Sequence, residues 1–357
     1  MKYLHIIEAT ATGTLSMASL LANAQQLQGN DVKVVYSLRP ETPEDIEEFF
    51  VSDIKKIMID MSSPKGKLLS IFSIKKVLDS YCPDVIVMHS SFAGFIGRLA
   101  VFLSRKKSNC YYIPHCISFM RKDIGNLKKG IFVALERIAS IKKCTYIACS
   151  NSELEEIKSK IPNCECLVVE NAVSDSFSDI KNSTKKVPEK KSIVSIGQIR
   201  TQKNPKLFAE ICKNLKGRNI EFIWVGDGDE DLKSHLIGNG VVVTGWVSPE
   251  EVKKHLANAK IYLSTSSWEG LPVSLIEASY ADVVIVATNC PGNTDIVTDG
   301  HTGYLYKDAG EAAKRILALL ASDETMEKIA KQARECALSR FSYEGYVRKM
   351  TEIMESN

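Results

Sequence analysis

Two glutamates eight residues apart, Glu269 and Glu277, stand on either side of an expected helix start. The apolar run before them, residues 259–263, predicts a buried strand. Gly270 allows a sharp turn, and Pro272 suits the first position of a helix, where its missing N–H removes no hydrogen bond. Glu269 is then expected at the mouth of the helix, with Glu277 about one and a half turns, or 7–8 Å, further along the axis.

A helix N-terminus that follows a strand attracts anions, because its free N–H groups and its dipole favour phosphate. Two carboxylates beside such a site would repel phosphate, so we expect them to face hydroxyl groups instead. A ligand with hydroxyls at both ends and a diphosphate between them is a nucleotide sugar. The alternative is structural, with Glu269 complementing the helix dipole and Glu277 solvated on the helix surface.

The whole phrase, Glu269-Gly-Leu-Pro, four residues and then Glu277-Ala, resembles the E-x7-E signature of the retaining glycosyltransferases of family four, of the bacterial surface-polysaccharide type. These have the GT-B fold. The resemblance implies an α/β protein of two Rossmann-like domains facing each other across a cleft. It places Glu269 on the donor sugar and Glu277 on the nucleotide ribose, and it implies donor contacts from Gly270, Leu271 and Pro272.

The composition is that of an ordinary globular protein. With 357 residues, 45% hydrophobic and 25% charged, the chain can form two domain cores. A net charge of +3 is too small to indicate nucleic-acid binding. The ten cysteines have no metal-binding spacing, so we expect reduced thiols and no metal site. Met1 leads into a strand instead of a signal peptide, and no apolar run approaches the ~20 residues that span a membrane, which predicts a cytoplasmic protein.

Strand and helix patterns predict two α/β domains. Strands expected at 3–7 and 32–36, with a helix at 15–27 between them, indicate a parallel sheet with right-handed crossovers. A polar, charged stretch later in the chain is typical of a linker. The resemblance implies that the last helix packs back on the first domain. The expected bounds are 1–173 for the acceptor-binding domain, 174–191 for the linker, 192–340 for the nucleotide-sugar domain and 341–357 for that last helix.

Three residues of the first domain are candidates because they follow strands, where open α/β sheets bind ligands. Gly13 stands in the turn after the first strand and lets the backbone approach a ligand closely. The resemblance places it near the donor phosphates, while the missing GxGxxG fingerprint weighs against a nicotinamide enzyme. His89 and Ser91 follow a strand at 85–88 and are candidates for binding the acceptor. A helix cap and a packed histidine are the alternative.

His115 ends the segment Tyr111-Tyr-Ile-Pro-His115, which predicts a strand followed by a loop. The segment resembles the Pro-His-Gly of the family, in which the histidine sits beside the reacting sugar. The resemblance therefore makes His115 a candidate catalytic residue, with a packed or supporting histidine as the alternative. Cys116 replaces the glycine of the family pattern, so we expect the loop to bend differently.

Basic residues gather between positions 98 and 143, where acidic residues are few. Solvated helix faces would explain the cluster. The other interpretation is attraction to anionic lipid headgroups, worth about 1 kcal/mol per basic residue near a membrane. Phenylalanines of the same span, such as Phe102 and Phe119, could add apolar contact. The cluster comprises Arg98, Arg105, Lys106, Lys107, Arg121, Lys122, Lys128, Lys129, Arg137, Lys142 and Lys143.

In the second domain, Arg200 and Lys203 lie on a turn between a strand ending at Gly197 and a following helix. Two cations before a helix N-terminus suit the clamping of a diphosphate. The family pattern has an arginine directly after the glycine, where this chain has Gln198. We expect Arg200 to supply that charge, with Lys203 and Gly197 matching the pattern directly.

Gly226 ends another strand and begins Gly226-Asp-Gly-Asp229. Two carboxylates spaced as Asp227 and Asp229 are a weak Mg²⁺ signal, so we expect no metal here. The Gly-Asp-Gly turn resembles the nucleotide-facing loop of the GT-B fold instead.

Residues 241–247 predict a further short strand. Its end, at Trp246 and Val247, resembles the family segment whose backbone holds the base.

Together these patterns and the resemblance predict a retaining, metal-independent hexosyltransferase, with His115, Glu269 and Lys203 as catalytic residues. It would move a hexose or N-acetylhexosamine from a nucleotide diphosphate sugar, with UDP as the expected nucleotide, to a lipid-linked or polysaccharide acceptor in O-antigen or capsule assembly. The nucleotide sugar is a co-substrate, and no other cofactor is expected. We expect peripheral contact with the inner face of the cytoplasmic membrane. A sugar-nucleotide epimerase of the same fold and a non-catalytic donor-binding subunit are the alternatives.

Overall fold

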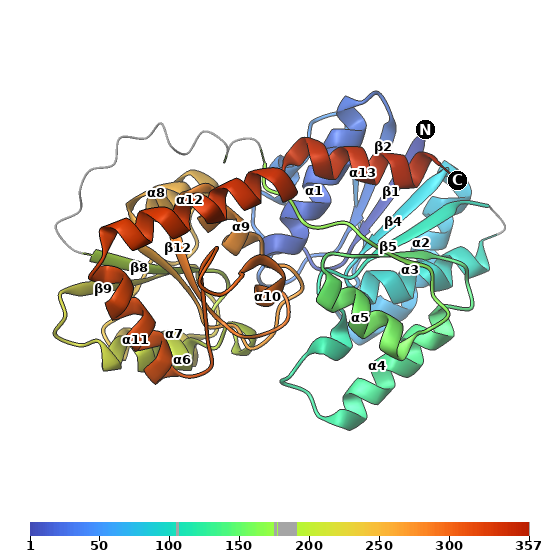
Figure 1. The fold of residues 1–357 in the computed structure, drawn as a ribbon. Coiled ribbons are helices and arrows are strands. Elements are labelled where there is room, and N and C mark those ends of the chain that lie inside the picture. The colour runs from blue at the N-terminus through green and yellow to red at the C-terminus, as the bar shows by residue number, and fades with distance from the viewer. Residues whose placement is uncertain (105–106, 175–176, 178–190, 357) are drawn as a thin grey trace. The chain divides into compact units, whose positions relative to one another are not determined.

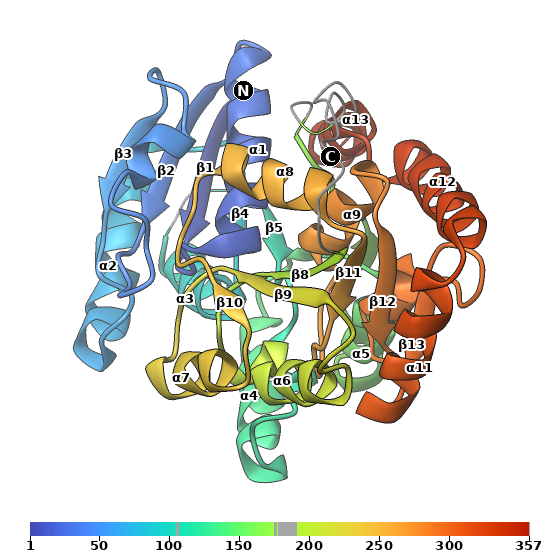
Figure 2. The ribbon, with the colours of Figure 1, turned by 90° about the vertical axis from the view of Figure 1, so that its left-hand side faces the viewer.

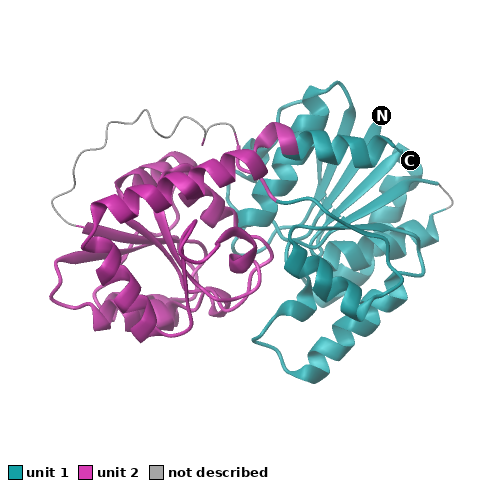
Figure 3. Ribbon diagram, in the orientation of Figure 1, with its two compact units in different colours: residues 1–170, 346–357 teal, residues 171–345 magenta. Residues whose placement is uncertain are grey.

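The computed structural model describes residues 1–104, 107–174, 177 and 191–356, which form two compact units (Figures 1 and 3). Unit 1 comprises residues 1–170 and 346–357, and unit 2 comprises residues 171–345. The linker expected at 174–191 falls mostly outside the described residues, and its last residue, Lys191, already belongs to a strand of unit 2.

Unit 1 is built on a parallel sheet of seven strands in the order β3-β2-β1-β4-β5-β6-β7. The central strands β1 and β4 are buried along almost their whole length, because helices cover both faces of a parallel sheet. The strands are β1 Lys2–Ile7, β2 Asp31–Tyr36, β3 Lys55–Met58, β4 Val85–His89, β5 Asn109–Ile113, β6 Thr145–Ala148 and β7 Cys166–Val168.

The helices of unit 1 pack on this sheet around a core of aliphatic and aromatic side chains from β1, β4, α2 and α3. The last turns of the C-terminal helix also join it, since the hydroxyl of Tyr111 donates to the carbonyl of Ile353 over 2.9 Å. The helices are α1 Thr12–Leu27, α2 Pro64–Tyr81, α3 Ser91–Leu103, α4 Asn126–Ala139, α5 Asn151–Lys160 and the later part of α13 Tyr343–Glu355.

Unit 2 contains a parallel sheet of six strands in the order β10-β9-β8-β11-β12-β13. Because all strands run the same way, their carboxyl ends meet at one edge, and the loops that leave that edge carry the candidate donor residues. The strands are β8 Lys191–Ile196, β9 Ile220–Val225, β10 Val242–Val243, β11 Ile261–Ser264, β12 Val284–Thr288 and β13 Tyr304–Tyr306.

Helices α6, α7 and α11 lie on one face of the second sheet, and α8 and α9 lie on the other (Figure 2). Trp224 and Phe208, whose rings meet edge to face, anchor the core on the side of α6. None of the helices in the described parts of the chain is long and apolar enough to cross a membrane. The helices of unit 2 are α6 Pro205–Asn214, α7 Glu230–Gly238, α8 Pro249–Asn258, α9 Val273–Tyr280, α10 Asn293–Ile296, α11 Ala309–Leu320 and α12 Asp323–Arg340.

The α/β class with two parallel sheets is as predicted, but three local expectations were wrong. Strand β10 has two residues instead of seven, because Gly245 takes a positive φ of 75° and turns the chain away. Helix α1 begins at Thr12, so Gly13 is helical and Thr12 carries the positive φ of the turn. Pro272 is the N-cap of α9 and not its first residue.

Candidate functional site

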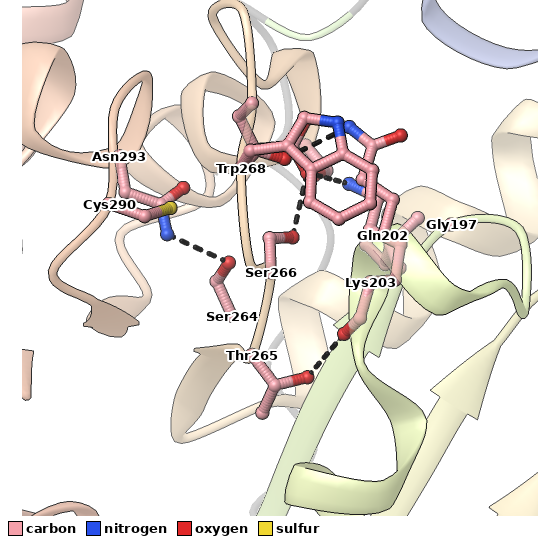
Figure 4. Close-up of polar contacts among 12 residues, drawn as sticks. Gly197, Gln202, Lys203, Ser264, Thr265, Ser266, Trp268, Cys290 and Asn293 are labelled. Atoms are coloured by element: carbon pink, nitrogen blue, oxygen red, sulfur yellow. Dashed lines mark hydrogen bonds and ion pairs between the residues drawn. The ribbon is translucent and has the colours of Figure 1, made fainter. Parts of the chain in front are cut away.

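The carboxylate of Glu269 is the centre of a polar cluster at the carboxyl edge of the second sheet. Figure 4 shows Gln202, Lys203 and Ser266, the three residues whose side chains contact it. It is largely buried in the loop between β11 and α9. One oxygen accepts from the ammonium of Lys203 over 2.8 Å and from the hydroxyl of Ser266 over 2.7 Å. The other accepts from the amide of Gln202 over 3.1 Å. A buried carboxylate with three donors is held in one orientation.

Lys203 lies at the end of a short 3₁₀ helix, Thr201–Lys203, that follows β8. The hydroxyl of Thr265 donates to its carbonyl over 2.7 Å and so joins the β8 loop to the β11 loop. Burial alone would lower the pKa of Lys203, but the neighbouring carboxylate of Glu269 outweighs burial and raises that pKa. Lys203 is therefore a fixed positive charge at this edge.

The loop after β12 supports Glu269 from behind. The backbone N–H of Glu269 donates to the carbonyl of Pro291 over 3.2 Å. Gly292 has a φ of 84°, and a Cβ placed on it would lie 2.6 Å from the Cβ of Glu269. Only glycine fits at this position, because any side chain would displace the glutamate.

Three glycines bring the loops after β8, β9 and β10 together. Gly226 has a φ of 139°, and a Cβ on it would lie 2.3 Å from the carbonyl oxygen of Gly197. A Cβ on Gly197 would in turn meet the side chain of Lys203 at 3.0 Å. Gly226 also forms a backbone bridge with Gly245. The missing side chains leave backbone amide and carbonyl groups at the edge, as close approach to a ligand requires.

Trp246, which follows Gly245, presents an exposed indole, 54% of its surface being accessible, and Val247 beside it is partly buried. An exposed indole offers a flat apolar face and one N–H donor to a ligand. The position of Trp246 beside the glycine loops suits stacking on a planar ligand group.

Asp227 and Asp229 both have partners inside unit 2. Asp227 forms an ion pair with Lys233 over 2.9 Å, and Asp229 accepts from the backbone N–H of Leu232 as the N-cap of α7. Within the described parts of the chain no three metal-ligating side chains come together. The expectation that this pair binds no metal stays a prediction.

Glu277 lies on α9, partly buried, and its pKa is raised to about 7. Burial is the main cause, and the positive charges of Lys203 and Lys253 oppose it only in part. The side chain is therefore not the freely solvated helix residue that the structural alternative required. A carboxyl group with this pKa changes charge near neutrality and gains from hydroxyl donors.

The residues between the two glutamates shape the loop. Gly270, Leu271 and Pro272 are all buried, and the carbonyl of Leu271 accepts from the amide of Asn171 over 2.7 Å. Any contact they make with a donor would involve the backbone. Arg200, by contrast, is exposed, and no ion pair involves it among the described residues. Its charge is available to an anion.

His115 follows β5 in unit 1 and has a φ of 54°, and the next residue, Cys116, has a φ of 95°. The loop therefore takes the left-handed conformation that a glycine would favour, and the expectation that it bends differently from the family's loop stays a prediction. Buried Glu153 stabilises the bend, because one of its oxygens accepts the backbone N–H groups of Cys116 and Ile117 over 2.8 and 2.7 Å. Strained backbone held in this way is common at functional sites.

His89 and Ser91 are engaged inside unit 1. His89 is fully buried, and its ring nitrogens lie 3.0 Å from those of His5 and His115. The hydroxyl of Ser91 accepts from the backbone N–H of Ser118 over 3.2 Å and so holds the loop after β5. Their direct contact with an acceptor stays a prediction. Gly13, in the first turn of α1, likewise keeps its predicted donor role untested.

Several site residues were not predicted from the sequence. Gln202, Ser266 and Gly292 surround Glu269, and His5 and Gln25 lie behind His89. The one available signal was His5, a polar residue in the middle of an apolar strand, since buried polar groups are uncommon without a partner. The other four are ordinary polar residues or glycine, whose role depends on which neighbours the fold supplies.

Two family models match the chain. Residues 13–177 match Glycosyltransferase Family 4, and residues 176–336 match Glycosyl transferases group 1. A protein of Klebsiella pneumoniae, described as an uncharacterized 41.2 kDa protein in the cps region, is 29% identical over 76% of this chain and 79% of its own. An Escherichia coli UDP-Gal:alpha-D-GlcNAc-diphosphoundecaprenol alpha-1,3-galactosyltransferase is 24% identical over 80% of this chain and 78% of its own.

Among solved structures, Anabaena HepE in complex with UDP-glucose superposes with a TM-score of 0.80. The match covers the whole of both chains at 17% identity and establishes likeness of fold. Fold and comparisons together define a glycosyltransferase of the GT-B class. The chain belongs to the family 4 glycosyltransferases.

Proposed function

We propose that the protein is a retaining glycosyltransferase that transfers a hexose or N-acetylhexosamine from a UDP-sugar to a lipid-linked or polysaccharide acceptor. The acceptor would belong to the assembly of O-antigen, capsule or a similar surface glycan. The nucleotide sugar binds unit 2, and the acceptor binds unit 1.

The observation that carries this proposal is the cluster at the carboxyl edge of the second sheet. It combines a largely buried lysine, Lys203, with an exposed arginine, Arg200, and a carboxylate, Glu269, that is held in place. A diphosphate needs the two cations, and sugar hydroxyls need the carboxylate. We assign Arg200 and Lys203 to the diphosphate and Glu269 to the sugar.

The chemistry follows from where charge develops. When the bond between the sugar and the phosphate breaks, the sugar gains oxocarbenium character and the departing diphosphate gains negative charge. Lys203 and Arg200 stabilise that negative charge, because preorganised charges need no rearrangement during the reaction. We propose that no divalent cation takes part, since Asp227 and Asp229 are committed to other partners. The acceptor attacks from the face that the leaving group vacates, which retains the anomeric configuration, and His115 binds the reacting sugar.

The relatives support UDP as the nucleotide. The E. coli relative is named for a UDP-galactose donor, and HepE was solved with UDP-glucose. In this chain Trp246 and Val247 would contact the base, while Glu277 would accept hydrogen bonds from the ribose. Gly13, Gly197 and Gly226, with the buried backbone of Gly270, Leu271 and Pro272, would line the path of the diphosphate.

A surface of α4 supports contact with a membrane. Leu127 and Ile131 on α4 and Ile141 just after it are exposed, at 82%, 52% and 77% of their surface. Exposed Lys128 and Lys143 lie in the same segment. Exposed apolar side chains interspersed with lysines suit an anionic lipid surface, where the apolar groups enter the headgroup region and the cations meet phosphates. We call residues 127–143 the α4 surface and propose that it contacts the inner face of the cytoplasmic membrane.

The E. coli relative, by its name, acts on a sugar linked to diphosphoundecaprenol, a lipid carrier. An acceptor of this kind would lie in the plane of the membrane. Peripheral contact through unit 1 would then bring the protein to its acceptor without a spanning helix.

The proposal is tested by thermal shift of wild type and Glu277→Ala with UDP, GDP and ADP, each with and without EDTA. We expect stabilisation by UDP that is insensitive to EDTA and is weakened in the variant. Stabilisation by none of the three, or an equal shift in the variant, would contradict the donor site.

Incubation with UDP-glucose, UDP-galactose or UDP-N-acetylglucosamine alone then separates transfer from epimerisation. An epimerase would release a changed UDP-sugar without acceptor, whereas the proposed transferase needs the acceptor for turnover. A protein that binds UDP yet turns over nothing with lipid-linked acceptors would be a donor-binding subunit.

A further inference from the structure

Three histidines of unit 1 form one continuous chain of ring contacts. Nδ1 of His5 lies 3.0 Å from Nε2 of His89, and Nδ1 of His89 lies 3.0 Å from Nε2 of His115. Adjacent rings are parallel to within 14° and 12°. His5 and His89 are fully buried, whereas His115 is partly exposed, so the chain runs from the interior to the strand ends.

Gln25 on α1 closes the inner end of this chain. Its Oε1 lies 2.7 Å from Nε2 of His5, and its Nε2 lies 3.4 Å from the sulfur of Met354 on α13. A thioether sulfur accepts hydrogen bonds but cannot donate. The amide nitrogen of Gln25 must therefore face Met354, and the amide oxygen must face His5.

This orientation fixes the proton positions of all three rings. A neutral imidazole has one donor nitrogen and one acceptor nitrogen, so hydrogen bonds along such a chain all point the same way. His5 donates from Nε2 to Gln25 and accepts at Nδ1 from His89. His89 accepts at Nδ1 from His115, which leaves the lone pair of His115 on its own Nδ1.

The three rings are neutral near pH 7. Burial lowers the pKa of His5 and of His115 to about 4. The pKa of His89 is lowered well below its ordinary value by burial and by its two histidine neighbours. Nδ1 of His115 is buried and has no hydrogen-bond partner among the described residues. A buried acceptor without a donor is costly, so this atom is suited to a ligand group that donates.

We propose that Gln25, acting through His5 and His89, sets the tautomer in which His115 presents Nδ1 as a hydrogen-bond acceptor to a hydroxyl of the sugar substrate. The proposal rests on the sugar-transferring function above, in which His115 already contacts the sugar, and it adds the residues that fix which ring nitrogen of His115 accepts the hydrogen bond. His115 recognises a hydroxyl and moves no proton. Gln25, His5 and His89 are positioning residues. The part of the sugar that contacts His115 must carry an O–H group.

The tautomer is tested directly by NMR of the full-length protein labelled with ¹⁵N-histidine, because protonated and unprotonated ring nitrogens have separate chemical shifts. His115 is assigned by comparison with His115→Asn. In wild type we expect the proton on Nε2 of His115. In Gln25→Leu we expect a mixture of both tautomers, since the inner end of the chain is no longer fixed. A proton on Nδ1 in wild type, or an unchanged spectrum in Gln25→Leu, would overturn the proposal.

Two further variants show whether the effect runs through the histidines. Gln25→Glu keeps an acceptor oxygen toward His5 and should retain the wild-type tautomer of His115. Gln26→Leu removes the neighbouring amide, which accepts a hydrogen bond from the backbone N–H of Val32 and not from a histidine. This variant should also leave the tautomer of His115 unchanged. A loss of the tautomer in Gln26→Leu equal to that in Gln25→Leu would show a general effect on α1 and contradict the proposal.

Binding supplies the functional readout. We expect Gln25→Leu to bind UDP as wild type does. The test ligand is whichever of UDP-glucose, UDP-galactose and UDP-N-acetylglucosamine wild type binds most tightly. The affinity that its sugar adds over UDP should fall about fivefold in Gln25→Leu, as expected for the loss of one neutral hydrogen bond. Equal sugar-dependent affinity in both proteins would overturn the recognition role. Failure of wild type to bind UDP would instead refute the proposed function, and the NMR result would still decide the tautomer.

Discussion

Nζ of Lys203 lies 2.8 Å from Oε1 of Glu269, and the two side chains are only 15% and 9% exposed. Each side chain is the other's ion-pair partner. A diphosphate that binds Lys203 must therefore share it with Glu269, while the carboxylate keeps Gln202 and Ser266 as donors. The ion pair keeps Lys203 positively charged and holds its ammonium group in one position.

Removal of Lys203 alone should destabilise unit 2. Lys203→Met leaves the buried carboxylate of Glu269 without its counter-charge, and the free energy of unfolding should fall by about 3 kcal/mol. All three tryptophans, Trp224, Trp246 and Trp268, lie in unit 2, so tryptophan fluorescence during urea unfolding follows this unit.

The double variant Lys203→Met/Glu269→Gln is the control, because it removes both charges and keeps the amide within reach of Gln202 and Ser266. It should recover at least half of the loss. Equal instability of the single and double variants would show that Lys203 stabilises the unit by packing and not by charge.

Lys203 should also be needed for turnover. Lys203→Ala should lower the rate of sugar transfer by about 10²-fold, by analogy with the loss of one transition-state donor. Rates are measured at a temperature where tryptophan fluorescence shows the variant folded. Lys206→Ala, an exposed lysine three residues later, should keep near wild-type turnover. A Lys203→Ala rate within fivefold of wild type would refute its assignment to the diphosphate.

UDP affinity should depend on pH through Glu277. Its pKa is raised to about 7, chiefly by burial, so the carboxyl group is mostly protonated at pH 6 and mostly ionised at pH 8. Ribose hydroxyls donate best to the ionised form, so affinity should rise with pH, by up to about tenfold between these values. Isothermal titration calorimetry at several pH values measures the slope.

Glu277→Gln provides the reference, because the terminal phosphate of UDP titrates near pH 6 in both proteins. The slope that remains in the variant belongs to the phosphate, and the difference belongs to Glu277. Identical slopes would mean that Glu277 does not meet the ribose.

Gly226→Ala should disturb the nucleotide loops. The new Cβ would lie 2.3 Å from the carbonyl oxygen of Gly197, at a φ of 139° that alanine rarely adopts. We expect a loss of about 2 kcal/mol in stability and weaker UDP binding. Gly238→Ala, at the end of α7, meets nothing within 4 Å and should stabilise by about 0.5 kcal/mol. Wild-type UDP affinity in Gly226→Ala would show that these loops tolerate displacement.

The α4 surface should bind anionic vesicles. Removing two exposed charges with Lys128→Ala/Lys143→Ala should cost about 2 kcal/mol, or about 30-fold in partitioning to vesicles that contain phosphatidylglycerol. Sedimentation with vesicles measures the change. Lys55→Ala/Lys76→Ala removes two exposed lysines elsewhere in unit 1 and should leave binding unchanged. Equal losses in both double variants would indicate only a diffuse charge effect.

The sequence by itself determined the class of fold and the location of the donor candidates. Alternating strand and helix patterns predict parallel sheets, and strands of a parallel sheet all carry their functional loops at one edge. The phrase from Glu269 to Glu277 and the cations Arg200 and Lys203 were therefore expected at that edge. Spacing along the chain is enough for such statements, because they concern residues that lie next to their own strand.

Only the tertiary structure decided which side chains face each other. The contact between Lys203 and Glu269 joins residues 66 positions apart, and the chain from His115 to Gln25 joins four elements with Met354 at its end. The left-handed bend at Cys116 depends on buried Glu153, which local propensity cannot reveal. Hydrogen bonds and ion pairs are sensitive to differences of a few tenths of an ångström in the distance between donor and acceptor. The packing of the whole unit sets those distances.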